Sequence, residues 1–328
     1  MRTEQFNSAT QGEDYYEKLG VTKIINAAGT YTMFSSSIMP LSVQAAVALA
    51  ARHSVRLLDL QRAAGEYIAR ALRCEAALVT AGASSAITLG TAACLSVANA
   101  EAIGKIPVDM TGLRDEVIVQ RAHRYDYDHS LTNCGIRFVE VNTTRDYEEA
   151  FSDRTAMAHF FNAASAGEIS REDWVRIAHQ NGIPCLNDAA ADVPPISNLW
   201  NYTAMGFDLV AFSGGKGMRG PQNAGLLLGR RELILAASRN NSPFDGTVGR
   251  GMKVAKEQIV GMVAAVDWFL SQSDDGMELE FRERALRIAE ELRDLPTLEA
   301  TIARPPVANH VPHLLLRYDP LRILITSS

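Results

Sequence analysis

The stretch Phe212-Ser213-Gly214-Gly215-Lys216-Gly217-Met218-Arg219-Gly220 places one lysine in a glycine-rich turn. The apolar run at 207–212 predicts a buried strand before this turn, and the run at 224–228 predicts the next strand. Lys216 is therefore expected at the end of a strand, where the four glycines let the backbone approach a ligand closely. The alternative is a solvated lysine in a tight surface turn, which this stretch by itself does not exclude.

A second candidate lies upstream, where the mostly apolar stretch at 182–187 is followed by Asp188. Three alanines come next, in place of solvating residues, which indicates a carboxylate directed into a pocket. Pyridoxal phosphate needs a lysine that forms an imine and a carboxylate that keeps its pyridine ring protonated. Asp188 has an alternative role as a helix N-cap, for which Asp192 is the better candidate. We therefore predict this cofactor, with Lys216 and Asp188 as catalytic residues.

A phosphate site is predicted where the apolar run at 76–80 meets the apolar helix expected at 86–98. Free backbone N–H groups and the helix dipole at such a helix start attract anions. The alternative is a plain serine N-cap at a strand-to-helix turn. The expected cofactor contacts here are Gly82, Ala83, Ser84 and Ser85, together with Ser213 from the lysine turn.

The segment at 120–129, between the second and third predicted strands, is dense in rings and charges. His123 falls a few residues past a strand end, where a flat imidazole is able to stack on a flat cofactor, and Tyr125 is the alternative. A solvated polar loop is the other interpretation of this segment. We expect no metal site, because His123 and His129 have no cysteine or histidine partners at ligand spacing.

Seven strands are predicted along the chain, and helical segments separate most of them. They are 76–80, 116–120, 137–141, 155–161 and three that end at Asp188, Phe212 and Leu228. This alternation predicts an α/β fold with a mostly parallel sheet covered by helices on both faces. Ligands of such sheets bind at the carboxyl ends of the strands, where Gly82, Asp188 and Lys216 all fall.

Several local elements are also predicted. The run at 23–31 is expected to form a short strand. Ser42 is expected to cap a helix that ends near Arg52, and Asp59 to cap one that ends at Arg73. Ser170 and Asp173 fit a capping box at the start of a helix over 171–181.

The composition excludes several classes of protein. The 328 residues carry a formal net charge of −6 with no basic runs, which disfavours a general nucleic-acid-binding surface. The four cysteines share no metal-like spacing and indicate buried free thiols in a reducing compartment. No apolar run reaches membrane-spanning length and the start of the chain lacks a signal core, so we expect a soluble, cytoplasmic protein.

The order of motifs resembles a known group of enzymes. The motifs lie at 25–30, 76–85, 138–144, 187–188, 212–216 and 220–222. They resemble the fold-type I pyridoxal phosphate enzymes of the selenocysteine synthase (L-seryl-tRNA selenium transferase) and D-glucosaminate-6-phosphate ammonia-lyase group. By that resemblance, Lys216 would hold the cofactor as an imine and Asp188 would face its pyridine nitrogen.

The expected function is that of a pyridoxal phosphate-dependent lyase that acts on a small anionic amino acid or amino sugar acid by α,β-elimination. The alternatives are a β-replacement enzyme like L-seryl-tRNA selenium transferase and a non-catalytic scaffold with the same fold. Arg219, Arg250 and Lys253 are the candidates for binding an anionic group of the substrate or a phosphate. We expect a homo-oligomer, dimeric or larger.

The expected domains are an N-terminal arm at 1–40, a large cofactor-binding domain at 41–272 and a small C-terminal α/β domain at 273–328. Selenocysteine synthases usually carry an extra N-terminal tRNA-binding domain, whereas this chain reaches the Asn26 motif almost at once. A tRNA partner is therefore disfavoured. The small domain normally continues past the point where this chain stops, so it is either truncated or unusually small.

Overall fold

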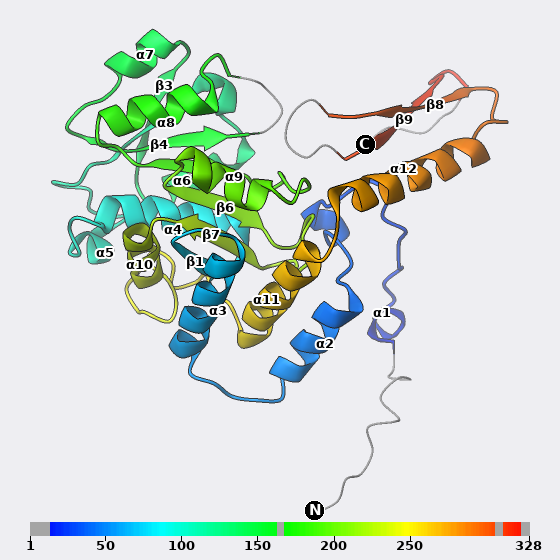
Figure 1. The fold of residues 1–328 in the computed structure, drawn as a ribbon, viewed down its shortest axis with the longest axis horizontal. Coiled ribbons are helices and arrows are strands. Elements are labelled where there is room, and N and C mark those ends of the chain that lie inside the picture. Colours follow the sequence, from blue (N-terminus) through cyan, green and yellow to red (C-terminus); the bar gives the residue numbers. More distant parts are fainter. Residues whose placement is uncertain (1–13, 163–166, 306–310, 323–328) are drawn as a thin grey trace, which may run out of the picture.

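A computed structural model describes residues 14–162, 167–305 and 311–322 of the chain. A seven-stranded sheet lies at its centre, with the strand order β1-β7-β6-β5-β4-β2-β3 (Figure 1). The strands are β1 (Ala76–Thr80), β2 (Glu116–Gln120), β3 (Arg137–Val141), β4 (Thr155–Phe161), β5 (Cys185–Asp188), β6 (Leu209–Ser213) and β7 (Gly225–Gly229). The seven predicted strands are confirmed.

The sheet is mostly parallel, as predicted. Strand β2 pairs in parallel with β3 and β4, β4 pairs in parallel with β5, and β5 pairs in parallel with β6. Strand β7 runs antiparallel to both β6 and β1. Successive residues of a strand enter different cores: Leu209 packs in one apolar cluster and Val210 in the other. Because side chains alternate across a strand, burial of both faces produces the continuous apolar runs seen in the sequence.

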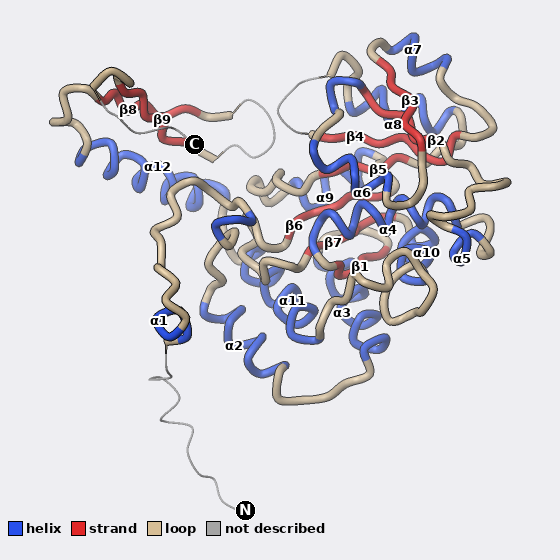
Figure 2. Tube along the Cα trace, turned by 180° about the vertical axis from the view of Figure 1, so that it is seen from behind, coloured by secondary structure: helices blue, strands red, loops and turns tan. Residues whose placement is uncertain are grey.

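Helices cover both faces of the sheet (Figures 1 and 2). One core cluster includes side chains of α3, α8, α9 and α11, and the other includes side chains of α4 and α10. The α-helices in the described residues are α1 (Tyr15–Lys18), α2 (Leu41–Ala50), α3 (Leu57–Ala71), α4 (Gly82–Ser96), α5 (Ala102–Lys105), α6 (His129–Thr132), α7 (Thr144–Glu149), α8 (Arg171–Gln180), α9 (Asn198–Met205), α10 (Arg231–Arg239), α11 (Lys256–Leu270) and α12 (Asp274–Glu291). Short 3₁₀ helices are η1 (Thr32–Phe34), η2 (Arg121–His123) and η3 (Asp126–Asp128).

The strand predicted over 23–31 is wrong, because this segment forms an irregular loop organised by Asn26. The Asn26 amide donates to the carbonyl oxygens of Gly29, Phe34 and Ser36, and its Oδ1 accepts from the N–H of Ala28. Such side-chain to backbone bonds compete with strand pairing.

Two predicted helix caps are also wrong. Pro40 precedes α2, so Ser42 lies inside the helix, and Arg56 precedes α3, so Asp59 lies in its first turn. An acidic side chain in the first turn interacts favourably with the positive end of the helix dipole, but it does not cap the helix. At α8, Ser170 does cap the helix by accepting from the N–H of Asp173.

The C-terminal part consists of α12 and an antiparallel hairpin, β8 (Leu298–Ala303) with β9 (His313–Tyr318). The hairpin lies beside α12 and apart from the seven-stranded sheet (Figure 2). The strand β8 was not anticipated from the sequence, and residues 323–328 lie outside the described residues. Among the described helices, none combines the length and apolar character needed to cross a membrane.

Candidate active site

Lys216 lies in the turn between β6 and β7, at the carboxyl end of β6. The turn is held by Gly214 N–H donating to Ala224 O at 2.8 Å and Gly220 N–H donating to Gly214 O at 2.8 Å. A Cβ atom on Gly217 would lie 2.1 Å from the carbonyl oxygen of Val193. The glycine therefore lets the lysine turn pack directly against the segment that follows β5.

The Lys216 side chain is half-buried and joins no hydrogen bond or ion pair within the described ranges. Burial lowers the pKa of its amine, and the nearby Asp188 and Asp192 partly offset that effect. A lysine with a lowered pKa is more often neutral near pH 7, which is what a nucleophile or a base requires. Lys216 is thus chemically different from a solvated surface lysine.

Asp188 is the last residue of β5 and is 3% exposed. Its Oδ2 accepts a hydrogen bond from the Tyr125 hydroxyl at 2.6 Å, and its Oδ1 accepts from the N–H of Ala190 at 3.0 Å. Burial raises the pKa of this carboxyl, although both hydrogen bonds work in the other direction. Asp188 does not cap a helix, and its hydrogen-bond partners are uncharged groups.

Of the predicted segment at 120–129, His123 is buried and Tyr125 is half-buried, whereas most of the other side chains are exposed. Tyr125 packs on Phe161 with ring centroids 3.9 Å apart, and it stacks on His159 at 6.3 Å. His123 is buried against the edge of Phe160, and its Nδ1 accepts from the N–H of Phe161 at 3.4 Å. Burial lowers the pKa of His123 to about 4, so the imidazole is neutral near pH 7. Which of these rings stacks on a cofactor stays a prediction.

The predicted phosphate turn forms the first turn of α4, which begins at Gly82 and so earlier than expected. Neither serine is the N-cap: Ala81 occupies that position, and no side chain caps the helix. Ser84 Oγ lies 2.6 Å from Ser130 Oγ, and Ser85 Oγ donates to Ala81 O. The N–H groups of this turn, including that of Ala83, are therefore free of side-chain caps and suited to an anion.

These groups fit pyridoxal phosphate by the chemistry of their donors. A lysine amine of lowered pKa, a buried carboxylate and an uncapped helix start are the three anchors that the cofactor requires. A Cβ on Gly225 would lie 2.5 Å from the backbone of Gly82, so β7 runs directly beside the helix start. The lysine turn and the phosphate turn therefore border the same strand.

Asp192 belongs to this region as well, although the sequence suggested a helix cap. It is 2% exposed, and its Oδ2 accepts from Asn162 Nδ2 at 2.7 Å and from the Tyr202 hydroxyl at 2.9 Å. The next helix, α9, starts only at Asn198. Burial raises the pKa of Asp192 to about 6. Asn162, which lies just after β4, was not singled out from the sequence, although a polar residue directly after an apolar strand indicates this edge of the sheet.

The three predicted anion-binding residues lie in different settings. Arg219 donates from Nε to Ile38 O at 2.9 Å and lies over the Trp268 ring, so it tethers the N-terminal segment to the core. Arg250 pairs with Asp245, which is 91% exposed, at 2.7 Å. Lys253 is exposed. Within the described ranges, neither Arg250 nor Lys253 forms a hydrogen bond or ion pair with Lys216.

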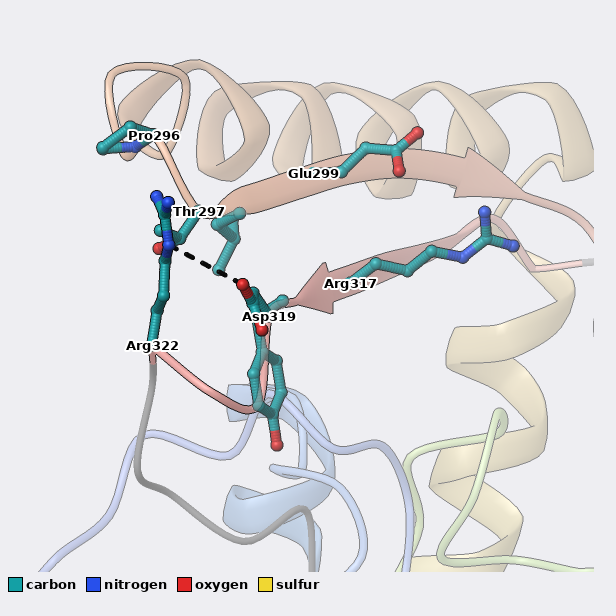
Figure 3. A pocket seen from close by; sticks show the side chains of 8 residues that line it. Pro296, Thr297, Glu299, Arg317, Asp319 and Arg322 are labelled. Atoms are coloured by element: carbon teal, nitrogen blue, oxygen red, sulfur yellow. Dashed lines mark ion pairs between the residues drawn. The ribbon is translucent and has the colours of Figure 1, made fainter.

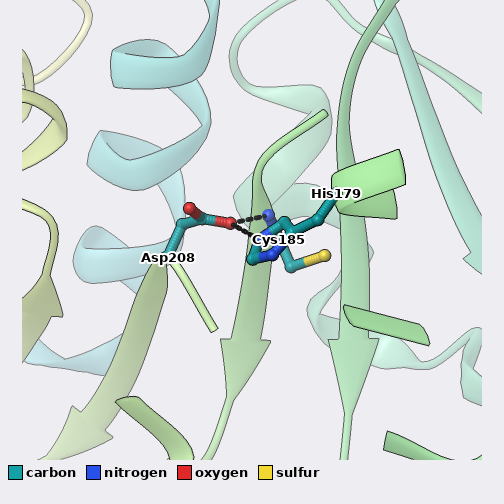
Figure 4. Close-up of side chains that lie close together, drawn as sticks. All are labelled: His179, Cys185 and Asp208. Carbon is teal, nitrogen blue, oxygen red and sulfur yellow. Dashed lines mark hydrogen bonds and ion pairs between the residues drawn. The ribbon is translucent and has the colours of Figure 1, made fainter. Parts of the chain in front are cut away.

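A cluster at the opposite end of the strands, formed by His179, Cys185 and Asp208, has the residue types of a metal site (Figure 4). Asp208 Oδ2 already accepts from Cys185 N–H at 2.7 Å and lies 2.9 Å from His179 Nε2. Its Oδ1 accepts from Arg230 at 3.0 Å. Burial also raises the pKa of the Cys185 thiol well above its usual value. Both carboxylate oxygens of Asp208 therefore already have hydrogen-bond partners within the protein.

A hollow at the C-terminal hairpin is lined by Glu299, Arg317, Asp319, Arg322 and their neighbours (Figure 3). It is formed by β8, β9 and the turns beside them, and none of the predicted site residues lines it. Arg322 pairs with Asp319 across it. The chemistry predicted from the sequence does not belong to this hollow.

Comparison with known proteins assigns the fold and the family. Residues 24–294 match the family model of L-seryl-tRNA selenium transferase. The chain is 30% identical over 264 residues to D-glucosaminate-6-phosphate ammonia lyase of Salmonella typhimurium (strain 14028s / SGSC 2262), which is 77% of this chain and 69% of the relative. It is 27% identical over 319 residues to 5'-C-glycyluridine monooxygenase-decarboxylase of a Streptomyces species, covering 93% of this chain and 77% of that one.

A solved structure of D-glucosaminate-6-phosphate ammonia-lyase superposes with a TM-score of 0.79 at 26% identity, over 94% of this chain and 83% of that one. The predicted fold-type I architecture, the predicted group of enzymes and the ammonia-lyase-like character are confirmed by these matches. The chain belongs to the L-seryl-tRNA selenium transferase family and is an enzyme of its pyridoxal phosphate-dependent group.

Proposed function

We propose that this protein binds pyridoxal 5'-phosphate and uses it as a lyase on a small anionic amino acid or amino sugar acid, by α,β-elimination. The observation that carries the proposal is the half-buried Lys216 amine of lowered pKa beside the buried Asp188 carboxyl. The similarity to D-glucosaminate-6-phosphate ammonia lyase supports elimination and a phosphorylated sugar acid as the substrate class.

Each anchor has a role in this proposal. Lys216 would hold the cofactor, Asp188 would hold the proton on its ring nitrogen, and the first turn of α4 with Ser84, Ser85 and Ser213 would bind its phosphate. When bound, the cofactor supplies an acceptor for the electron pair of a broken Cα–H bond. The Lys216 amine would take the Cα proton, which its lowered pKa permits near pH 7. His123 and Tyr125 are the rings available to cover the cofactor.

Arg250 and Lys253 are proposed to bind the anionic group of the substrate or a phosphate. The partner of Arg250 is almost fully exposed, and an exposed ion pair contributes little stability. Arg250 is therefore able to exchange Asp245 for a ligand anion, whereas Arg219 is already engaged with Ile38 and Trp268. A guanidinium suits a phosphate because it donates two parallel hydrogen bonds.

A homo-oligomer is proposed because the N-terminal segment and α2 present a series of apolar side chains to solvent. Each of the following is more than half exposed: Ile25, Met33, Ile38, Leu41 and Leu49. Exposed apolar side chains that gather in one segment of a chain are typical of subunit contacts. We place the protein in the cytoplasm, in keeping with its four free cysteines.

The substrate class is tested with a panel of amino acids and phosphorylated amino sugar acids, followed by release of ammonia and a keto acid. We expect the best substrate among the anionic compounds. Arg250→Ala should raise KM for that substrate about tenfold and leave KM for an uncharged analogue nearly unchanged. Arg284→Ala, which removes an exposed arginine paired on α12, is the matched control.

The β-replacement alternative rests on the family match to L-seryl-tRNA selenium transferase. Salt-sensitive binding of seryl-tRNA, with no product from any small substrate, would favour it over elimination. The net charge of −6 argues for a small molecule, because tRNA binding draws on many phosphate contacts.

A further inference from the structure

Asp192 is a second buried carboxylate beside the lysine turn. The segment from Asp188 to Val193 runs beside the end of β6, from which that turn continues: Ala189 N–H donates to Ala211 O at 3.0 Å, and Ser213 N–H donates to Ala190 O at 3.4 Å. Gly217 follows Lys216 directly, and the carbonyl oxygen of Val193 lies so close to it that a Cβ atom on Gly217 would clash. Asp192 is therefore fixed by the backbone next to the residue on which the proposed chemistry depends.

The Asp192 side chain is held in place by neutral donors. Tyr202 from α9 and Asn162 from the end of β4 both donate to Oδ2, while Asn198 Nδ2 donates to the backbone oxygen at 2.7 Å. The charged groups that act on Asp192 are Asp188 and Arg171, of which Arg171 lies over the Tyr202 ring at 5.7 Å. Asp192 forms no ion pair among the described residues, and its charge acts on that of Lys216.

We propose that Asp192 is a positioning residue that favours the protonated form of Lys216 and so strengthens Lys216 as a base. This inference rests on the proposed function. When the Cα–H bond of the substrate breaks, its proton forms an N–H bond on Lys216 and its electron pair passes to the bound cofactor. A fixed anion beside the lysine favours the ammonium ion that this step produces. Asp188 is committed to the ring nitrogen, so it does not supply that effect alone.

The test is the pH dependence of the absorbance band of the lysine-bound cofactor in the full-length, loaded protein. Asp192→Asn keeps the shape and removes the charge, so the midpoint of this transition should fall by about one pH unit. Asp173→Asn removes the same charge from an exposed position on α8 and should leave the midpoint unchanged. An unchanged midpoint in Asp192→Asn would overturn the inference.

Tyr202→Phe provides a second variant in case Asp192→Asn does not fold. Loss of the hydroxyl raises the pKa of Asp192, so less of it is ionised at pH 7 and the midpoint should shift in the same direction by a smaller amount. If Tyr202→Phe loses stability without any shift, the network has only a structural role and the inference fails.

The outcomes separate this inference from the proposed function. A protein that shows no cofactor band contradicts the proposed function. In that case, the pKa of Lys216 in the full chain is measured by competitive acetylation against pH and mass spectrometry of its peptide. A lower Lys216 pKa in Asp192→Asn than in the parent would still support the influence of Asp192 on Lys216, and equal pKa values would overturn it.

Discussion

Buried carboxylates occur at both ends of the parallel strands, and their partners differ. At the amino ends, Asp115 precedes β2 and Asp208 precedes β6, and both pair with arginines. At the carboxyl ends, Asp188 and Asp192 accept only from neutral hydroxyl, amide and backbone groups. All four are at most 5% exposed.

The difference appears in the pKa values. Burial works against ionisation of Asp115, but Arg154 and Arg137 outweigh it and lower its pKa. For Asp188 and Asp192, burial outweighs the hydrogen bonds and raises the pKa. The charges at the amino ends are compensated by ion pairs with arginines, whereas Asp188 and Asp192 form no ion pair among the described residues and both act on the charge of Lys216. This asymmetry is typical of a structural edge and a functional edge of one sheet.

Among substitutions of these four carboxylates, the largest effect is expected for Asp188→Asn, which removes the charge proposed to hold the proton on the cofactor ring. Turnover should fall by about 10²- to 10³-fold, while cofactor affinity changes by less than about tenfold. Steady-state kinetics and an absorbance titration with cofactor measure the two effects. Near-normal turnover with the cofactor bound would mean that another group faces the ring nitrogen.

At the other end of the strands, Asp208→Asn should act on stability and not on chemistry. The change removes the anion shared by Arg230 and His179 and leaves the buried Cys185 N–H with a poorer acceptor. We expect a loss of about 2 kcal/mol in the free energy of unfolding, measured with urea, and turnover within a few-fold of the parent. A large loss of turnover in folded protein would remove the distinction between the two edges.

An effect of similar size, seen only as a change of stability with pH, is expected from His159, whose ring nitrogens are buried and have no hydrogen-bond partner among the described residues. Burial and the neighbouring His123 lower the pKa of His159 to about 3. Between pH 6.5 and this value the unfolded chain binds a proton that the folded protein does not, so stability is lost as the pH falls. From pH 7 to 5 this residue should contribute a loss of about 2 kcal/mol.

The His159 effect is isolated by urea unfolding of the parent and of His159→Gln at both pH values. The variant lacks the titrating group, so its stability should decline less than that of the parent over the same window. Equal declines would show that His159 is not held neutral by the fold.

Much of this organisation was predictable from the sequence because it depends on local patterns. Six of the seven strands are almost wholly buried and form apolar runs, the exception being the edge strand β3. The lysine turn requires glycine where Val193 packs against it. The roles of Tyr125 and Asp192 depend on distant contacts: Tyr125 meets Asp188 from 63 residues away, and Asp192 meets Asn162 from 30. No periodicity in the sequence encodes such pairings. The strand predicted at 23–31 was wrong for the opposite reason, because the Asn26 side chain forms local hydrogen bonds with backbone groups that a strand would pair elsewhere.

The central claim is that Lys216 holds pyridoxal phosphate at the functional edge. The direct measurement is the absorbance spectrum of the purified full-length protein before and after borohydride reduction, with mass spectrometry of the reduced peptide. The account predicts a yellow protein whose visible band is abolished by borohydride, with the cofactor fixed to Lys216. Lys216→Ala should lose this band and at least about 10⁴-fold in turnover. A colourless protein that gains no band with added pyridoxal phosphate would contradict the account.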